Sequence, residues 1–364
     1  MCEETAEAFG QRCSDCVSSG FTSLAIALGV RLKLFQNMPT CVEQATTAAA
    51  LAATLGYKER YVREWLSVVV CAQFVTVDET GNKFWLPEHR KRILVSSALH
   101  AHSLGMSLMM TMLAASFRGV CSCFPIDGPN GLPYEEYSCF SEYMSGISDK
   151  IHENSLLDKF IPSIPGLVPA LESGIMVLDV GCGTGTPSFL MSQKYPKSTF
   201  HGVDFLQKAI DMAEQRASKF NLQNLHYLLH SATELPKDWN ERFSFVTTFD
   251  AVHDQARPDL VLSEIYRVLK PGGWFSMVDI KAETELVKNR SSPNAAMMYA
   301  ISLFHCMPVS LYFKGGFGLG TMWGRRKAEQ MLRESGFSQI QVIELPYNDK
   351  CYHYLCRKAK TVAQ

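Results

Sequence analysis

The spacing of hydrophobic positions changes about halfway along the chain. Between residues 59 and 72, apolar side chains recur three and four positions apart, which places them on one face of a helix that covers a core. From Gly174 onward, short apolar runs alternate with amphipathic stretches instead. This alternation is typical of an α/β domain with a parallel sheet. The pattern therefore predicts a helical first part and an α/β second part.

Three helices and a β-hairpin are predicted for residues 1–95. Segments 20–35, 46–55 and 59–72 have helical spacing, and Gly56 closes the second of them. The runs FVTV and KFWL flank the turn DETGN, whose glycine suits the positive φ that hairpin turns require. Helices followed by a two-stranded wing predict an α-rich winged-helix domain at residues 1–95.

The charge of this first domain bears on its partners. Residues 1–95 contain ten Lys or Arg and ten Asp or Glu, and the segment KERYVREW alternates in sign. Domains that read DNA usually present a basic stripe to the phosphates. The charge balance therefore argues against a nucleic-acid partner and favours packing or homodimerisation through the winged-helix domain.

Residues 96–171 show helical spacing without a strand pattern. Two breaks rich in Pro and Gly, FPIDGPNGLP and IPSIPGLVP, flank a helical stretch at about 134–160. We expect a helical connector that roofs the active site. The α/β domain then occupies residues 172–364.

Seven strands are predicted for this α/β domain. Five apolar runs predict parallel strands, and helical segments follow the first, second and fourth of them: IMVLDV, TFHGVD, NLHYLL, FSFVTTFD and WFSMVDI. QIQVIEL and CYHYLCRK are joined by the short segment PYND and form a hairpin, so the sheet has an antiparallel pair at its edge. The residues between the fifth strand and a helix at 325–334 are predicted as a loop-rich insertion.

Composition and cysteine content indicate the cellular setting. The 364 residues are 47% hydrophobic with 12 scattered cysteines, and Lys plus Arg number 35 against 36 Asp plus Glu. This composition supports a buried core, reduced thiols and no basic field for nucleic acid or an anionic membrane. The first twenty residues do not resemble a signal peptide, and no run approaches the roughly 20 apolar residues of a membrane span. We therefore expect a cytoplasmic protein without a membrane partner.

The strongest chemical signal is LDVGCGTG, at the end of the first strand of the α/β domain. Gly181, Gly183 and Gly185 remove three side chains, so the backbone can turn sharply and approach a ligand closely. Asp204 follows at the end of the next strand, where a carboxylate can accept hydrogen bonds from both hydroxyls of a ribose. The combination predicts a nucleoside-binding site.

The spacing of the glycines distinguishes between nucleosides. Dinucleotide-binding loops read G-x-G-x-x-G and place a pyrophosphate on a helix N-terminus, whereas this turn reads G-x-G-x-G. Asp179 stands two residues before the first glycine, and its carboxylate would repel a pyrophosphate but attract the ammonium group of a methionine moiety. The turn therefore favours S-adenosylmethionine over NAD, which leaves an NAD-dependent oxidoreductase as a weaker alternative.

These motifs resemble those of class I S-adenosylmethionine-dependent methyltransferases. LDVGCGTG, FHGVDF and RVLKPGGWF match that family over about residues 174–357. The resemblance implies a Rossmann-like, seven-stranded sheet with an antiparallel last strand. It implies that Asp179 and the glycine turn, with Cys182 inside it, hold the amino-acid part of S-adenosylmethionine. It also implies that Asp204 binds the ribose and that Phe205 lies against the adenine.

The adenine end departs from the family pattern. Where the family often has an acid after the third strand, this chain reads His230-Ser231-Ala232. Ser231 and the backbone of Ala232 are therefore the expected contacts.

A finer resemblance covers nearly the whole chain, to a group of methyltransferases with an N-terminal winged helix. YVREWL, FDAVHDQARPD and ISLFHCMPVSLYFKGGFGLGTMWG carry it. Plant small-molecule O-methyltransferases, which are similarly organised, carry a His-Asp step at a similar distance before the glycine turn PGG, and its His is their base. By this similarity His253 is the candidate general base, and Asp254 is an orienting or cofactor-side acid. The chain lacks the Trp that follows the step in the plant enzymes, so a purely structural His253 stays an alternative.

Four further residues are candidates for the substrate pocket. His305 and Trp323 lie in the insertion after the fifth strand, which in this fold usually contributes substrate contacts. Tyr137 and Tyr143 come from the helical connector.

The sequence thus predicts methyl transfer from S-adenosylmethionine to a small-molecule acceptor, with oxygen as the acceptor atom. Two alternatives stay open: N-methylation by proximity, which needs no strong base, and a winged-helix regulator that senses S-adenosylmethionine. The pairs Cys13/Cys16 and Cys121/Cys123 lack a second pair or a spaced histidine, so no metal site is predicted.

Overall fold

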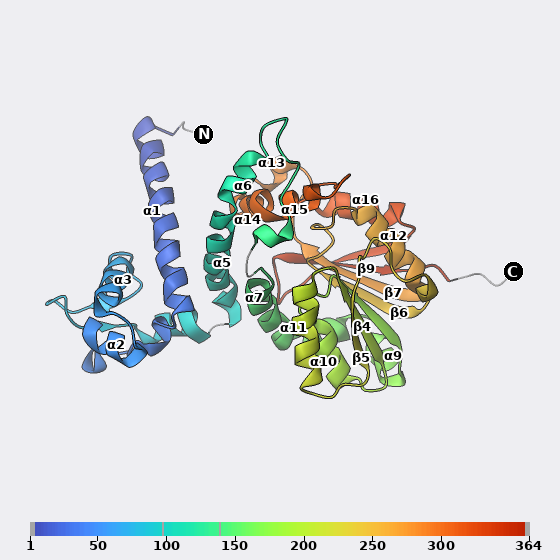
Figure 1. Ribbon diagram of the computed structural model, residues 1–364, viewed down its shortest axis with the longest axis horizontal. Coiled ribbons are helices and arrows are strands. Elements are labelled where there is room, and N and C mark those ends of the chain that lie inside the picture. The colour runs from blue at the N-terminus through green and yellow to red at the C-terminus, as the bar shows by residue number, and fades with distance from the viewer. Residues whose placement is uncertain (1–3, 97, 138–139, 361–364) are drawn as a thin grey trace. The chain divides into compact units, whose positions relative to one another are not determined.

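The computed structural model describes residues 4–96, 98–137 and 140–360 (Figure 1). The chain forms two compact units, Met1–Ala114 and Ala115–Gln364. The dividing point falls within the predicted helical connector, so helices of that segment contribute to both units. The first unit contains the winged helix and the second contains the large sheet.

The first unit is a helical domain with a small hairpin. Its helices are α1 (Ala6–Arg31), α2 (Ala48–Leu55), α3 (Glu59–Cys71), α4 (Glu88–Lys91) and α5 (Ala98–Ala115). β1 (Thr76–Val77) pairs antiparallel with β2 (Phe84–Trp85), which confirms the predicted wing. Trp65 of α3 packs edge-to-face on Phe35 with ring centroids 5.0 Å apart, and its Nε1 donates to Ala25 O of α1 at 2.9 Å. These contacts join α1 and α3 in one core.

Helix α1 begins at Ala6, well before the predicted Gly20. Thr5 caps it, because its side-chain oxygen accepts a hydrogen bond from the amide of Ala8 at 3.2 Å. Residues 6–19 are rich in small and polar side chains. They lack the apolar stripe on which a prediction from hydrophobic spacing depends, so this half of the helix was not predicted.

The second unit is built on one sheet of seven strands, in the order β5-β4-β3-β6-β7-β9-β8. β9 is antiparallel to both of its neighbours, and the other pairs are parallel. The predicted α/β sheet with an antiparallel pair near its edge is thereby confirmed. The strands are β3 (Met176–Val180), β4 (Thr199–Asp204), β5 (Leu225–Leu229), β6 (Phe243–Phe249), β7 (Leu269–Ile280), β8 (Gln339–Glu344) and β9 (Cys351–Arg357).

Helices cover both faces of this sheet. The helices of this unit are α6 (Phe117–Ser122), α7 (Phe140–Ser155), α8 (Ile161–Ser163), α9 (Leu167–Ser173), α10 (Thr186–Lys194), α11 (Gln207–Ser218), α12 (Pro258–Val268), α13 (Leu286–Asn289), α14 (Ala295–Ile301), α15 (Met307–Tyr312) and α16 (Arg325–Glu334). Val177 of β3 packs in an apolar cluster with α8, α9 and α10, whereas the next residue, Leu178, packs with α12 and α16. Successive strand residues point to opposite faces, and Figure 1 shows α12 beside α16.

The insertion between β7 and α16 differs from its loop-rich prediction. Half of it is helical, and α14, the π-helical turn η7 (Ser302–Cys306) and α15 follow one another directly. The glycines that suggested a loop lie beyond this stretch, at 315–320. Within the described chain, this stretch and α1 are long and apolar enough to cross a membrane by length and composition, although the sequence pattern led us to expect no such span.

Candidate active site

A glycine turn links β3 to α10 at the carboxyl edge of the sheet. Gly181, Gly183 and Gly185 have φ angles of +67°, +52° and +74°, which other residues rarely adopt. The amides of Gly181 and Cys182 both donate to Val203 O of β4, at 2.9 and 3.0 Å. These bonds hold the turn against the end of β4.

A side chain packs against the turn at Gly185, whereas the space beside Gly183 is open. A Cβ at Gly185 would collide with the ring of Tyr227, whose hydroxyl donates to Gly185 O at 2.8 Å. A Cβ at Gly183 would meet nothing within 4 Å. The turn therefore leaves space for a ligand beside Gly183. The sequence did not single out Tyr227, because it occupies an ordinary strand position in β5.

Asp204 lies at the open centre of the turn. Its Oδ2 accepts the amide of Gly183 and its Oδ1 accepts the amide of Leu206, both at 2.9 Å. Burial raises the pKa of Asp204 above the usual aspartate value, and these amide bonds oppose the shift. The next residue, Phe205, is 40% exposed. A carboxylate and an accessible aromatic ring thus adjoin each other, as binding of a ribose and an adenine requires.

Asp179 lies beneath the turn, within β3. It is 1% exposed, and the hydroxyl of Ser188 donates to its Oδ2 at 2.8 Å. Burial raises the pKa of Asp179 to about 7. It forms no ion pair with any residue that the structure describes. A cationic ligand group would therefore compensate a carboxylate that the chain leaves without a cation.

The expected adenine contacts differ in exposure. The amide of His230 donates to Asp204 O at 2.9 Å, which places this segment at the same edge of the sheet. Ser231 is exposed, with its Oγ 2.8 Å from Thr233 Oγ1, whereas Ala232 is buried in the apolar cluster under α12. A ligand can therefore reach the Ser231 hydroxyl, and only the backbone of Ala232 offers polar groups.

His253 lies in the turn that follows β6. It is 4% exposed, and its Nδ1 is 2.8 Å from Asp279 Oδ1 on β7. The same oxygen accepts the indole Nε1 of Trp323 at 3.1 Å and the amide of Ile280 at 2.8 Å. Asp279 therefore holds the imidazole, and the structure places Trp323 against Asp279. The signal that could have revealed Asp279 is an acid inside an otherwise apolar strand, which needs partners to be buried.

Asp254 lies on the other side of the imidazole. Its Oδ1 is 3.2 Å from His253 Nε2 and is buried without a hydrogen-bond partner. Burial alone would lower the pKa of His253, but the carboxylates of Asp279 and Asp254 outweigh it and raise that pKa well above its ordinary value. Burial, with Asp279 nearby, also raises the pKa of Asp250 to about 7. One histidine thus lies among three acids.

Aromatic side chains lie between Phe205, beside the glycine turn, and His305. Tyr134, in the short helix η4 (Tyr134–Glu136), has its ring centroid 5.2 Å from Phe205 and 5.6 Å from His305. Tyr137 lies 4.6 Å from His305, between ring centroids, and its hydroxyl donates to Phe304 O at 2.7 Å. Burial lowers the pKa of His305 to about 4, so this ring is neutral at pH 7. Tyr134, which the sequence did not single out, thus contacts both Phe205 and His305.

Helix α7 is tied to the end of the glycine turn. Its Asp149 accepts hydrogen bonds from Thr186 Oγ1 at 2.5 Å and from Arg216 at 2.9 Å. Thr186 follows Gly185 directly, so these bonds connect the helix to the turn. Tyr143 is half-buried on the same helix.

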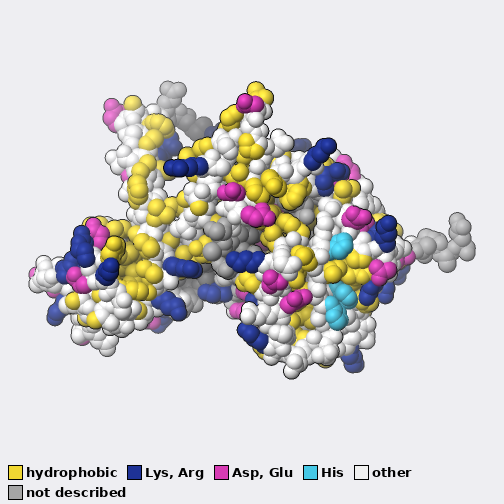
Figure 2. Space-filling view, in the orientation of Figure 1, with side chains coloured by type: hydrophobic (Ala, Val, Ile, Leu, Met, Phe, Trp, Pro, Cys, Tyr) yellow, Lys and Arg dark blue, Asp and Glu magenta, His cyan; other side chains and the backbone are white. Residues whose placement is uncertain are grey.

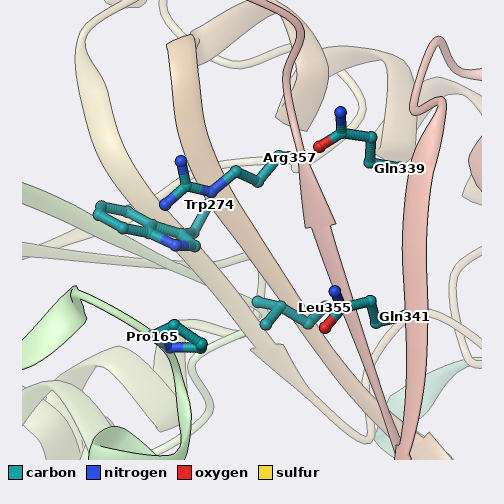
Figure 3. A pocket seen from close by; sticks show the side chains of 6 residues that line it. All are labelled: Pro165, Trp274, Gln339, Gln341, Leu355 and Arg357. Carbon is teal, nitrogen blue, oxygen red and sulfur yellow. The ribbon is translucent and has the colours of Figure 1, made fainter.

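A separate hollow of about 250 Å³ lies on the sheet (Figure 3). Its lining residues are Pro165, Trp274, Gln339, Gln341, Leu355 and Arg357. The Arg357 guanidinium stacks on Trp274, 4.3 Å from the ring centroid. Trp274 pairs with Phe245 near the start of β6, so the hollow lies toward the sheet edge opposite His253.

The residues at the carboxyl edge fit S-adenosylmethionine. The open space at Gly183 adjoins the Asp204 carboxylate, and Asp179 beneath it lacks a cation among the described residues. These groups match an open path for the nucleoside, an acceptor for ribose hydroxyls and a counter-charge for an ammonium group.

Known proteins show the same two domains. Residues 171–336 match the family described as a methyltransferase domain, and residues 20–96 match an Rv2258c-like winged HTH domain. A demethylmenaquinone methyltransferase of Listeria monocytogenes is 26% identical over 192 residues, which make up 52% of this chain and 80% of that protein.

Solved structures share the fold over nearly the full length. An O-methyltransferase family protein from Burkholderia thailandensis has a TM-score of 0.68 at 16% identity, and the match covers 99% of this chain and 100% of that chain. Human N-acetylserotonin methyltransferase, solved with S-adenosylmethionine, has a TM-score of 0.65 at 14% identity, with the same coverage of both chains.

The fold and the glycine-turn site define an S-adenosylmethionine-dependent methyltransferase. In this chain the catalytic domain is joined to an amino-terminal winged-helix domain of the Rv2258c-like kind.

Proposed function

We propose that the chain transfers the methyl group of S-adenosylmethionine to a hydroxyl group of a small cytoplasmic molecule, with His253 as the general base. The observation that carries the proposal is the His253–Asp279 pair beside the glycine turn. A Cβ at Gly181 would lie 2.7 Å from Ala251 Cβ. The turn that contains His253 therefore packs directly against the turn that would hold the methyl donor.

Each residue has a separate task in this mechanism. S-adenosylmethionine supplies an electrophilic methyl group on a sulfonium. Asp179 binds the ammonium group of the donor, and Asp204 accepts hydrogen bonds from its ribose. In its neutral form His253 accepts, at Nε2, the proton that the attacking hydroxyl loses, while Asp279 accepts the Nδ1–H and so keeps the lone pair on Nε2. The carboxylates that raise the pKa of His253 make it a stronger base, which acts once it has released its own proton. Positioning of the two reactants supplies most of the rate gain, and proton transfer adds roughly 10²–10⁴-fold.

The acceptor side adds aromatic faces to the polar groups around His253. The rings of Tyr134 and Tyr137 flank the neutral imidazole of His305. Ligand sites of this kind bind flat, largely apolar molecules and orient them through a small number of polar contacts. We therefore assign a small aromatic alcohol as the acceptor class.

N-methylation is the alternative that one observation favours. Asp250, Asp254 and Asp279 surround His253, and this acidic side would attract an amine. Amine nitrogen needs no strong base once it has lost its proton, so proximity alone could serve.

A metabolite screen with an isotopically labelled methyl donor tests the reaction. The full chain is incubated with small-molecule extract, and the same extract with an Asp204→Ala variant serves as the control. We expect label on the oxygen of a small compound with the unchanged chain alone. Label on nitrogen would overturn the hydroxyl assignment, and no labelled compound at all would overturn methyl transfer to a small molecule.

We also propose that the chain forms a homodimer through α1. Val17, Phe21, Leu24 and Leu28 are exposed and recur along one face of the helix, and Figure 2 shows hydrophobic side chains on this part of the surface. A two-fold contact would bury the same stripe on both copies. Light scattering should report a dimer for the unchanged chain and a monomer for Phe21→Asp. A monomeric unchanged chain would contradict this assembly.

A further inference from the structure

His253 and two neighbouring side chains form a cluster of three potential metal ligands. The ligand atoms of His253, Asp254 and Cys306 all lie within 4.8 Å of one another. His253 and Asp254 belong to the turn after β6, whereas Cys306 is the last residue of η7. These segments are far apart in the sequence, so no local spacing reveals the cluster. Sequence spacing, which reveals only ligands close together in the chain, therefore predicted no metal site.

The hydrogen bond to Asp279 prepares His253 as a ligand. A neutral imidazole that donates Nδ1–H to Asp279 Oδ1, 2.8 Å away, carries its lone pair on Nε2. Nε2 is the atom that faces Asp254. Histidines bound to metals almost always donate their other ring nitrogen to a carboxylate, a carbonyl or water. Asp279 supplies that outer partner before any metal arrives.

Asp254 offers an oxygen that the chain leaves unsatisfied. Its Oδ1 lies 3.2 Å from His253 Nε2 and is buried without a hydrogen bond. With a neutral imidazole, two acceptor atoms face each other across this gap, an arrangement that is unfavourable unless a proton or a metal cation lies with them. Among the described residues, His253 is the sole ion-pair partner of Asp254 and of Asp279. Two carboxylates thus share one imidazole, so this gap favours a cation, either a proton on Nε2 or a metal ion.

Cys306 presents its sulfur from a fixed position. It is 4% exposed, and the hydroxyl of Thr321 donates to its Sγ at 3.1 Å. It ends a π-helical turn, a rare geometry that is frequent at functional sites. The sulfur is thus held in the cluster by both the backbone and a side-chain donor.

We propose that His253, Asp254 and Cys306 form a three-ligand site for a divalent cation of the zinc class. Nitrogen, sulfur and carboxylate donors suit Zn²⁺, whereas Mg²⁺ and Ca²⁺ prefer oxygen ligands. Binding releases to solvent the Cys306 thiol proton and the Nε2 proton of a charged His253, and it leaves the fourth tetrahedral position to water or an acceptor. The metal occupies Nε2, so it inhibits methyl transfer. That inhibition rests on the proposed role of His253, whereas metal binding does not.

Metal titration of the full chain tests the site without donor or acceptor. Zinc is added in competition with a chromophoric chelator, and cobalt replaces it for absorption spectroscopy. We expect zinc affinity to fall at least roughly tenfold in Cys306→Ser and in Asp254→Asn. The matched control is Cys356→Ser, a buried thiol of β9 outside the cluster, which should keep the affinity of the unchanged chain. The thiolate-to-cobalt absorption band should vanish only in Cys306→Ser.

Two results would overturn the site: no zinc binding by the unchanged chain, or unchanged affinity in both Cys306→Ser and Asp254→Asn. Asp254→Asn is nearly isosteric, so it decides the question even if Cys306→Ser does not fold. A methyl-transfer assay then addresses inhibition separately. Turnover lost with one equivalent of zinc and restored by a chelator supports it, whereas a bound metal that leaves turnover intact overturns the inhibition alone.

Discussion

The imidazole of His253 is held by Asp279, whose Oδ1 lies 2.8 Å from its Nδ1, and not by the adjacent residue in the chain. Asp279 belongs to β7, and β7 pairs directly with β6, the strand that leads to His253. Sheet pairing therefore sets the geometry of the two side chains. The indole of Trp323 donates to the same oxygen, which fixes the carboxylate in turn.

Replacing Asp279 with Asn should cost turnover but not donor affinity. An amide can donate to Nδ1, which moves the ring proton to Nε2 and removes the lone pair that accepts the substrate proton. We expect turnover to fall by roughly 10²-fold or more, measured by steady-state kinetics. Calorimetry should give an unchanged Kd for S-adenosylmethionine. A parallel loss of donor affinity would instead mean that Asp279 only supports the fold.

Removal of the proposed base itself should also lower turnover without changing donor affinity. We expect His253→Ala to lower turnover by roughly 10²–10⁴-fold with donor affinity intact, because the proton of the acceptor hydroxyl then has no positioned acceptor. His305→Ala is the informative companion, since it removes a second buried imidazole from the proposed acceptor side. If His305 only lines the pocket, its loss should raise the acceptor KM more than it lowers turnover. Near-normal turnover of His253→Ala would point to methylation by proximity.

Asp204→Ala should weaken donor binding by about 1.5–3 kcal/mol, the range for hydrogen bonds to a charged group. The carboxylate also accepts the amides of Gly183 and Leu206, so its loss frees the turn as well as the ribose. Asp211→Ala is the control, because Asp211 is a surface acid of α11 that bonds only Gln207 among the described side chains. Calorimetry that shows equal affinities for the two variants would place the ribose elsewhere.

Local sequence patterns were enough to predict the sheet and the position of the glycine turn. The motif LDVGCGTG contains both the apolar end of a strand and the glycines that can adopt the positive φ angles of the turn, so a few consecutive residues are enough to recognise it. The hairpin of β1 and β2 is likewise encoded by a turn between two apolar runs. Helix α1 was only half predicted, because its first turns depend on the Thr5 cap and on small residues instead of an apolar stripe.

The acceptor side depends on contacts that no local pattern carries. Asp279 meets His253 only because β6 and β7 pair in one particular register. Cys306 reaches the same group from η7, inside an insertion that was predicted as loop-rich, and Trp323 reaches it from the turn before α16. Sequence spacing identifies a ligand turn more readily than a cluster assembled from three separate segments.

Donor binding should strengthen with rising pH because of Asp179. Burial raises the pKa of this carboxyl from 3.8 to about 7 in the free protein, so below pH 7 it is largely neutral and offers no counter-charge to an ammonium group. Its raised pKa favours the folded state at low pH, and this contribution is lost as pH rises from about 3.8 to 7. Donor affinity follows the opposite course and should level off above about pH 7.

Calorimetry across this range, in buffers of different ionisation enthalpy, measures both the affinity and the proton released on binding. Asp179→Asn should bind the donor more weakly and should flatten the pH profile. A profile of the same shape in Asp179→Asn would show that another group titrates.

Gly183→Ala should distinguish two reasons for a glycine in the turn: the positive φ angle and the space that the ligand needs. The φ of +52° costs an alanine roughly 1–2 kcal/mol of folding free energy, but its Cβ meets nothing in the free protein. Gly56→Ala is the matched control, with a φ of +69° and equally open surroundings at the end of α2. Both variants should lose similar stability in denaturant unfolding. Only Gly183→Ala should lose donor affinity, by at least about tenfold, or 1.4 kcal/mol, because its methyl group fills the space that the nucleoside needs. Equal donor affinity in both variants would mean that the ligand does not pass beside Gly183.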